Sequence, residues 1–143
     1  MIVITNIRNL KPNMYDETYA IVRSLKSSSP WLKQVSVLSP SPNLFHKYMM
    51  LKNMGQWSAE AFRTIYVPQF IYEIRYSQAA ANALNTIVQM HREGKRIAMA
   101  CFCPDETLCH RSIIAGLLQG HGEEVITDTG NDYSLYYKQY LEA

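Results

Sequence analysis

Hydrophobic residues recur along the chain in two different patterns. Short apolar or β-branched runs predict buried strands at 1–7, 18–25, 96–103 and 123–128. Apolar residues spaced three or four positions apart predict amphipathic helices. These helical segments lie at 42–54, 59–65, 68–76, 78–92 and 132–141, and a further helix is expected to be capped by Thr107.

Capping and breaking residues mark several boundaries of these elements. Serine and proline in the segment SPSPN favour the first turn of a helix that Gly55 ends. Ser58 is expected to cap the next helix, and Pro68 marks a bend where a helix can restart. A turn is expected at 27–30, and residues 17–25 fit the start of a helix as well as a strand.

The order of these elements predicts the fold class. Strands and helices alternate with short connections, which favours an α/β fold with a mostly parallel sheet. We expect a three-layer, Rossmann-like arrangement in which helices flank a small sheet on both faces. The length of 143 residues fits a single domain, 1–143.

The composition narrows the range of partners and the cell compartment. Lys and Arg total 14 against 12 Asp and Glu, so no strong positive field directs the chain to duplex nucleic acid or to a membrane. No apolar run is long enough to span a bilayer. The three cysteines are an odd number and lie close together, which is typical of a reducing compartment. We therefore expect a cytoplasmic protein.

The most informative stretch is CFCPDETLCHR, which holds all three cysteines within residues 101–111. It joins the end of a buried strand to the start of a helix, the place where α/β sheets bind ligands. Free amides at a helix start attract anions, and the guanidinium of Arg111 suits a phosphate or a carboxylate. The expected ligand-binding residues are Arg111, Thr107, Cys103, His110, Ser112 and, from the second strand, Arg23. A salt bridge to Asp105 or Glu106 is the alternative role for Arg111.

A reactive thiol is a second interpretation of the same stretch. The helix start is expected to lower the pKa of Cys109, and His110 is the candidate base. Cys109 and His110 are therefore the catalytic candidates if the protein is an enzyme. The helical stripe of Cys109, Ile113 and Leu117 predicts that Cys109 faces the core.

A zinc site is a third interpretation. Cys101, Cys103, Cys109 and His110 are permitted zinc ligands. Adjacent residues on a helix diverge, however, and the spacing matches no familiar zinc motif. We therefore expect no cofactor, with zinc as the less favoured alternative. Cys101 itself, inside an apolar strand, is expected to pack in the core.

Aromatic residues are frequent in the middle and at the C-terminus of the chain. Phe62, Tyr66 and Phe70 are four residues apart and predict a stripe that faces the core, although an aromatic ring at the pocket rim would stack a base. The C-terminal segment DYSLYYKQYLEA is expected either to pack on the domain or to form a homo-oligomer contact.

The Cys-His-Arg piece and the upstream segment LSPSPNLFHKYMMLKNMGQWSAEAFRTIYVPQF resemble the family known as domain of unknown function 488. The resemblance covers roughly residues 36–125, and Cys101, Cys109, His110 and Arg111 match its pattern. It implies a compact α/β domain with a pocket at the Cys-His-Arg corner, but no established reaction. Many relatives carry a glutamate where this chain has Cys103, and an Asp-Val-Arg segment that is here Ile21-Val22-Arg23.

Three functional hypotheses follow. The first is a binder of a nucleotide or another phosphate-bearing small molecule, which would act as a sensor or as a phage-type protein that sequesters nucleotides for anti-defence. The second is a cysteine-dependent transferase or hydrolase acting on a nucleotide or a nucleic-acid-derived substrate. The third is a domain without ligand, whose cysteines pack or hold zinc. Whether any reaction is catalysed stays open at this stage.

Overall fold

The computed structural model describes residues 1–25 and 29–143. Its strands are β1 (Ile2–Asn6), β2 (Glu17–Ala20), β3 (Lys33–Gln34), β4 (Ile97–Cys101) and β5 (Val125–Thr127). Its α helices are α1 (Pro42–Asn53), α2 (Ala59–Ala61), α3 (Val67–Arg75), α4 (Gln78–Arg92), α5 (His110–Gly120) and α6 (Leu135–Glu142). Between them lie the 3-10 turns η1 (Ile7–Asn9), η2 (Ser36–Leu38) and η4 (Glu106–Leu108), and the π-helical turn η3 (Phe62–Tyr66).

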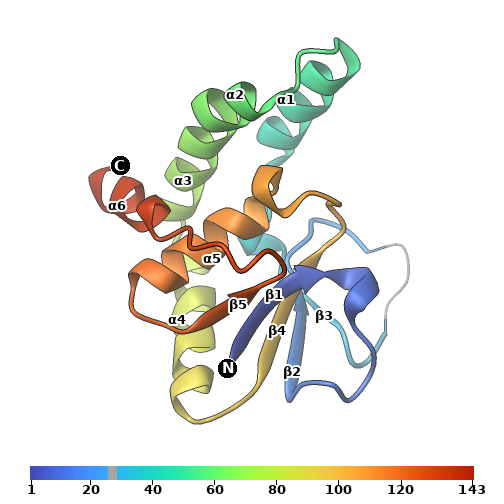
Figure 1. Ribbon diagram of the computed structural model, residues 1–143, viewed down its shortest axis with the longest axis vertical. Helices are drawn as coiled ribbons and strands as arrows, with labels where there is room; N and C mark the ends of the chain where they lie inside the picture. The colour runs from blue at the N-terminus through green and yellow to red at the C-terminus, as the bar shows by residue number, and fades with distance from the viewer. Residues whose placement is uncertain (26–28) are drawn as a thin grey trace.

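The described strands form one parallel sheet in the order β3-β2-β4-β1-β5 (Figure 1). Ile2 pairs with Ile97 and Asn6 pairs with Cys101, so the central strands β1 and β4 end side by side. In a parallel sheet the loops that leave the carboxyl ends of the strands share one edge. The expected α/β class with a parallel sheet flanked by helices is confirmed.

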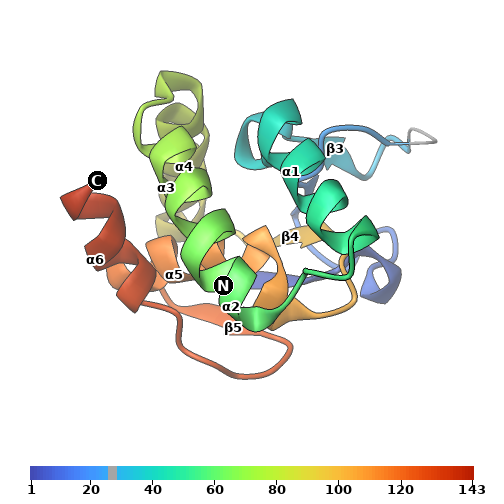
Figure 2. The same cartoon turned by 90° about the horizontal axis from the view of Figure 1, so that it is seen from above.

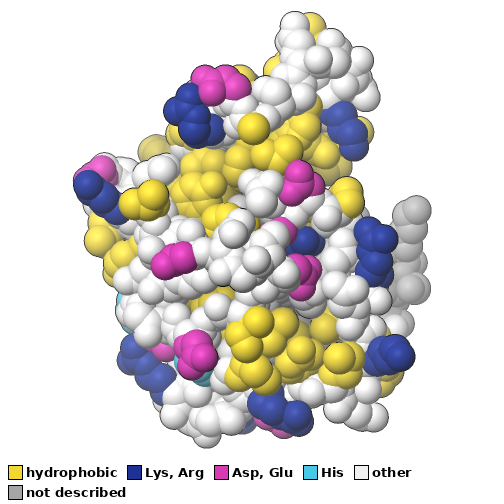
Figure 3. All heavy atoms as spheres, in the orientation of Figure 1, with side chains coloured by type: hydrophobic (Ala, Val, Ile, Leu, Met, Phe, Trp, Pro, Cys, Tyr) yellow, Lys and Arg dark blue, Asp and Glu magenta, His cyan; other side chains and the backbone are white. Residues whose placement is uncertain are grey.

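The two faces of the sheet carry different outer layers. Ile2, Ile97 and Met99 are fully buried on the face that packs against the helices. The opposite face is lined by smaller side chains, among them Ala98 and Ala100. Its cover consists of Leu10 and the partly buried Ile7, Tyr15 and Trp31, which belong to η1 and to loops. Figure 3 shows hydrophobic side chains that remain at the molecular surface over this part of the sheet.

Two helical arms extend beyond the carboxyl edge of the sheet, as Figures 1 and 2 show. One arm is α1, and the other is the continuous helix made by α2, η3 and α3. Ser41 caps α1, and its hydroxyl accepts a hydrogen bond from the Leu44 amide at 3.1 Å. The Ser41 amide and hydroxyl also donate to the Glu73 carboxylate at 2.9 and 2.5 Å. Glu73 on α3 therefore fixes the start of α1 beside the second arm.

Several expected helices are confirmed. The helix at 78–92 has the predicted bounds, and Ser58 caps α2 through a hydrogen bond from Ala61 at 3.0 Å. Pro68 lies in the first turn of α3 as expected, and the π-helical turn before it continues the helix from α2. Phe62, Tyr66 and Phe70 are buried, with ring centroids 5.3 and 6.2 Å apart along the row. The predicted core-facing aromatic stripe is therefore correct.

Other boundaries differ from the prediction. β2 ends at Ala20, not Leu25, because Ile21 and Val22 turn into the core after the last residue of the pairing strand. β4 and β5 are likewise shorter than expected, and the last helix begins at Leu135. The expected turn at 27–30 lies partly outside the described residues. Among the described residues, no helix is both long enough and apolar enough to cross a lipid bilayer.

The tyrosine-rich C-terminal segment packs on the rest of the chain. Helix α6 lies against α5 and α3, with Tyr133, Tyr136, Tyr137 and Tyr140 partly buried on the main core. This contact corresponds to the first of the two roles expected for the segment.

Candidate functional site

The cysteine-rich corner connects β4 to α5. Helix α5 begins at His110, and Cys109 is its N-cap residue. Thr107 is exposed and belongs to η4, where the Asp105 carboxylate accepts hydrogen bonds from the Thr107 amide at 3.0 Å and from its hydroxyl at 2.7 Å. The expectation that Thr107 caps the helix is wrong, because Asp105 begins a separate 3-10 turn before α5.

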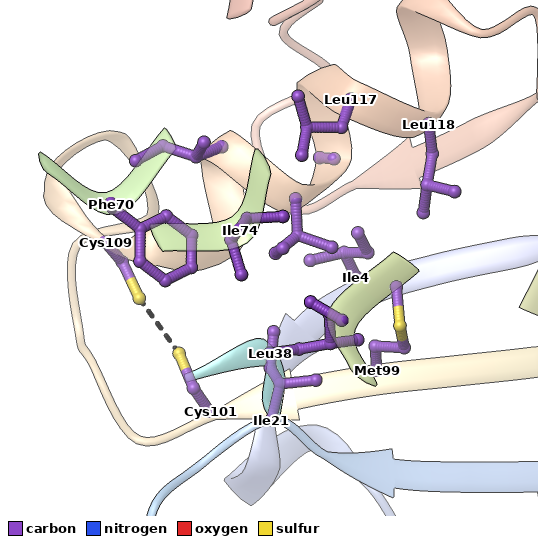
Figure 4. Close-up of a cluster of buried hydrophobic side chains, with 14 of the residues drawn as sticks. Ile4, Ile21, Leu38, Phe70, Ile74, Met99, Cys101, Cys109, Leu117 and Leu118 are labelled. Atoms are coloured by element: carbon purple, nitrogen blue, oxygen red, sulfur yellow. Dashed lines mark hydrogen bonds between the residues drawn. The ribbon is translucent and has the colours of Figure 1, made fainter. Parts of the chain in front are cut away.

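Three sulfur atoms and one imidazole meet at this corner. One potential ligand atom from each of Cys101, Cys103, Cys109 and His110 lies within 4.8 Å of the others. The Sγ atoms of Cys101 and Cys109 are 2.9 Å apart (Figure 4), and the cysteines are free thiols. Cys103 is half-buried, whereas the other three residues are buried. The four residues form what we call the sulfur cluster.

The side chains of Cys109 and His110 point toward the same centre, although the two residues are adjacent in the sequence. The distance from Cys109 Sγ to His110 Nδ1 is 3.6 Å. Two successive helical residues would point about 100° apart, which is why we expected them to diverge. That expectation is wrong because Cys109 has extended backbone angles, φ −121° and ψ 146°, and only His110 is helical.

The imidazole of His110 is oriented by a backbone carbonyl. His110 Nε2 lies 2.7 Å from the carbonyl oxygen of Ile21, just after β2. A carbonyl can only accept a hydrogen bond, so Nε2 carries the proton when the ring is neutral. The lone pair on His110 Nδ1 then faces the three cysteine sulfur atoms. The sequence offered no signal for this partner, because it depends on how β2 ends.

Close packing makes the thiols differ in acidity. Hydrogen bonds from Cys103 and Cys109 lower the pKa of the Cys101 thiol well below its ordinary value. The hydrogen bond to that sulfur raises the pKa of Cys103 to about 12. Burial, followed by the bond to Cys101, raises the pKa of Cys109. The expected lowering of the Cys109 pKa is therefore wrong, because burial disfavours the charged form of this thiol.

Arg111 supports the cluster from below and is almost completely buried, with 2% of its side chain exposed. Its Nη1 atom donates to the Cys103 carbonyl at 2.7 Å and to Cys101 Sγ at 3.6 Å. Its Nη2 atom lies 3.7 Å from the Asp128 carboxylate, which replaces the ion pair to Asp105 or Glu106 that was the alternative. The guanidinium thus binds the chain's own loop and lies against the sulfur of Cys101.

Two further polar residues hold the loop in place. Asn6 Nδ2, at the end of β1, donates to the Cys103 carbonyl at 3.0 Å. Glu106 is buried, and its carboxylate accepts hydrogen bonds from Asp128 N at 2.8 Å, Thr129 Oγ1 at 2.5 Å and Tyr133 Oη at 2.6 Å. Sequence reasoning missed both roles, since nothing in the pattern marks Asn6 or Glu106 as buried.

A pocket of about 460 Å³ opens above the cluster, between the two helical arms. Cys101, Cys103, Cys109 and His110 contribute to its lining at the carboxyl edge of the sheet. Most of the remaining lining is apolar, and Arg23, Ser24 and Ser39 add polar groups. The apolar and aromatic part of the lining comes from Val22, Pro40, Phe45, Tyr48, Tyr66, Phe102 and Leu108.

The predicted site residues divide into two groups. Cys103, Cys109, His110 and Arg23 line the pocket, and Arg23 lies on the same rim as Cys103 as the parallel sheet suggested. Thr107, Arg111 and Ser112 lie outside that lining: Thr107 is on the surface, and Arg111 and Ser112 are buried beneath it. The Ser112 hydroxyl donates to the Cys109 carbonyl at 2.8 Å.

The fold and the site define an α/β protein with a thiol-lined pocket at the carboxyl edge of a parallel sheet. Within that class, residues 11–122 match the model of the family described as the active DUF488-N3 subclade, and the chain belongs to this family. No curated protein and no solved structure matches the chain. The family match agrees with the resemblance seen in the Cys-His-Arg segment and the helix before it.

Proposed function

We propose that the chain binds a nucleotide or another phosphate-bearing small molecule in the pocket above the sulfur cluster. The observation that carries the proposal is the combination of an apolar, aromatic cavity with an arginine in its lining. A volume of about 460 Å³ lies within the range of small-molecule sites. Such a binder would act as a sensor of its ligand or would sequester it.

The aromatic wall suits a planar base. Tyr48 and Tyr66 lie on the two arms, with their ring centroids 6.3 Å apart, and both line the pocket. The ring of Trp57 packs edge-on against Tyr48, with the ring centroids 4.7 Å apart, and holds the Tyr48 ring in position. Aromatic side chains stack readily on the faces of nucleobases. The arms therefore provide the base-binding part of the proposed site.

Arg23 is the candidate for the phosphate. Its Nε atom donates to the Pro40 carbonyl at 3.0 Å, which fixes the guanidinium at the pocket. Among the residues that the structure describes, no carboxylate forms a salt bridge with Arg23, so its terminal nitrogens remain able to bind an anion. Arg111 contributes indirectly, since it holds the loop that carries Cys103.

The test compares nucleotides with the matching nucleosides. We expect millimolar mononucleotides to raise the Tm of the wild-type protein. Arg23→Ala should weaken nucleotide binding about tenfold or more and leave nucleoside binding nearly unchanged, because only the phosphate is recognised by a charged hydrogen bond. Arg96→Ala, at the opposite edge of the sheet, is the matched control. Absence of any nucleotide-induced shift, or equal affinities in wild type and Arg23→Ala, would contradict the proposal.

A cysteine-dependent enzyme is the second candidate. The pocket floor holds three cysteine thiols beside an oriented imidazole. In this candidate, His110 Nδ1 would take the Cys109 proton while the substrate lies in the pocket. Cys109→Ala should then abolish turnover of the substrate and leave its affinity within severalfold. A Cys109→Ala protein with unchanged turnover would exclude Cys109 as the nucleophile.

A further inference from the structure

The sulfur cluster brings together a complete set of ligands for a transition-metal ion. Cys101, Cys103, Cys109 and His110 come from the end of β4, the loop after it and the start of α5, and their ligand atoms lie within 4.8 Å of one another. Three thiolates and one imidazole are a common ligand set of structural zinc sites. The unfamiliar sequence spacing is no obstacle, because the extended Cys109 turns its side chain toward the same point as His110.

The distances are close to those that a tetrahedral ion requires. With Zn–S bonds of about 2.3 Å and a Zn–N bond of about 2.1 Å, neighbouring ligand atoms lie roughly 3.5–3.8 Å apart. Cys109 Sγ and His110 Nδ1 already have this spacing, at 3.6 Å. Cys101 Sγ and Cys109 Sγ are 2.9 Å apart, so they must separate by about 1 Å to reach the tetrahedral spacing.

His110 is also held as metal-binding histidines usually are. A ligating imidazole normally donates its second N–H to a carboxylate or a backbone carbonyl, which fixes its orientation and tautomer. The 2.7 Å contact between His110 Nε2 and the Ile21 carbonyl provides this bond. The lone pair of Nδ1 is thereby directed at the three sulfurs.

The charge around the cluster provides an independent observation. A divalent ion with three thiolates and a neutral imidazole carries one net negative charge, which is costly to bury without compensation. Arg111 is 2% exposed, and its Nη1 atom is 3.6 Å from Cys101 Sγ. Its only described carboxylate partner, Asp128, is 3.7 Å away and 38% exposed, so part of the Asp128 charge is balanced by water. The buried guanidinium is placed to neutralise the metal–thiolate centre.

We propose that Cys101, Cys103, Cys109 and His110 together bind one zinc ion in a closed, four-ligand site. The ion fastens the end of β4 to the first turn of α5 and forms the floor of the pocket. Its role is structural, because all four coordination positions are filled by the protein. This inference is independent of nucleotide binding, but it removes Cys109 as a free nucleophile.

The competing state is a disulfide between Cys101 and Cys109, whose sulfurs are the nearest pair. That bond would remove two of the four ligands and prevent zinc binding. The two states therefore differ in the number of free thiols, and in whether zinc protects those thiols.

The experiment begins with protein purified from zinc-containing medium, without chelator and with a phosphine reductant. Elemental analysis should find about one zinc per chain, as expected for one four-ligand site. Replacement by Co²⁺ should give the visible bands of a tetrahedral cobalt ion together with a thiolate charge-transfer band. The half-buried Cys103 thiol should react faster with a chromogenic disulfide after chelation than before it. These readouts use the wild-type chain, so they do not depend on the folding of a variant.

Two variants assign the ligands. His110→Asn and Cys103→Ser should each lower zinc affinity tenfold or more, whereas His46→Asn, which alters an exposed histidine on α1, should leave it unchanged. Reduced protein that contains no zinc, shows no tetrahedral cobalt bands and has thiols that zinc does not protect would overturn the proposal. Zinc binding with unchanged affinity in both variants would also overturn it. Arg23→Ala should retain zinc, so loss of nucleotide binding and loss of metal binding remain separate results.

Discussion

Buried polar residues around the site act on the loops that carry the chemistry. Asn6 and Arg111 both donate to the Cys103 carbonyl, at 3.0 and 2.7 Å, and Glu106 accepts three hydrogen bonds from the segment after β5 and from Tyr133. A buried polar group is stable only when its hydrogen bonds are satisfied. These residues therefore favour one conformation of the corner, in which all of these hydrogen bonds are made.

Glu106→Gln tests this role at a single residue. The amide keeps one acceptor oxygen. Its NH2 group, however, must face hydrogen-bond donors that point at a carboxylate oxygen in the wild-type protein. We expect a loss of about 1–3 kcal/mol in the free energy of unfolding, measured by urea denaturation. The exposed Glu142→Gln should change the stability by less than about 0.5 kcal/mol. A Glu106→Gln protein as stable as that control would show that the buried carboxylate is not required.

The sequence identified several site residues correctly in position but not in orientation. Arg23, Cys103 and His110 were expected at the pocket and line it. Arg111 was expected above the helix start, yet it points inward to Cys101 and Asp128. A helical pattern gives the phase of a residue but not the first residue of the helix. The prediction that Cys109 faces the core is correct. An error of a few residues at Thr107 was enough to misplace His110 and Arg111 around the helix axis.

At the scale of whole elements, the close contact between α5 and α6 depends on two glycines. A Cβ atom at Gly116 would lie 2.1 Å from the Tyr133 carbonyl oxygen, and one at Gly120 would lie 2.1 Å from Tyr137 Cβ. Both distances are far below any van der Waals contact. The absence of side chains at these positions therefore lets the C-terminal helix lie directly on α5.

Gly116→Ala should consequently destabilise the protein, although alanine is favoured over glycine within a helix by about 1 kcal/mol. The clash is with backbone, which cannot rotate away, so we expect a net loss of about 1–3 kcal/mol and faster proteolysis of residues 132–143. Asn85→Ala, at an exposed position of α4, should be neutral or slightly stabilising. Increased stability in Gly116→Ala would show that α6 does not pack as described.

Element order was easier to predict than element contacts. The alternation of strands and helices and the helix at 78–92 follow directly from hydrophobic spacing and capping residues. The strand order β3-β2-β4-β1-β5 does not, because it depends on which strands pair across long connections. The link between Ser41 and Glu73 also joins residues far apart in the sequence. Such contacts leave no periodic signal in a single chain.

Across the whole molecule, the two edges of the sheet carry different kinds of side-chain groups. The carboxyl edge carries the pocket and the sulfur cluster, whereas a charged network lies where α4 and α5 end, near the start of β5. There the buried Glu123 contacts His91 at 3.1 Å, Arg92 at 2.8 Å and His121 at 3.4 Å. This network ties the ends of two helices together on the side away from the pocket.

Glu123 should make the stability of the whole fold depend on acid pH. Burial acts to raise the pKa of Glu123, but hydrogen bonds from His91 and Arg92 outweigh it, and the pKa is lower than in the unfolded chain. Below the ordinary value of 4.5, the unfolded chain takes up a proton that the folded chain does not, so unfolding is favoured. The stabilisation from Glu123 is therefore complete above that pH and is lost as the pH falls through the folded pKa.

Glu123→Gln removes the titrating carboxyl group, and the Tm of this variant is compared with that of wild type as the pH is varied. At pH 7 the variant should have a lower Tm than wild type, because the charged hydrogen bonds to Arg92 and His91 are weakened. The difference in Tm should shrink steadily as the pH is lowered from 5 toward 3, since the wild-type carboxylate is then being protonated as well. Glu124→Gln, at the exposed neighbouring position, should follow the wild-type profile throughout. A Tm difference between Glu123→Gln and wild type that stays constant over this range would mean that Glu123 stabilises the fold by its shape and not by its charge.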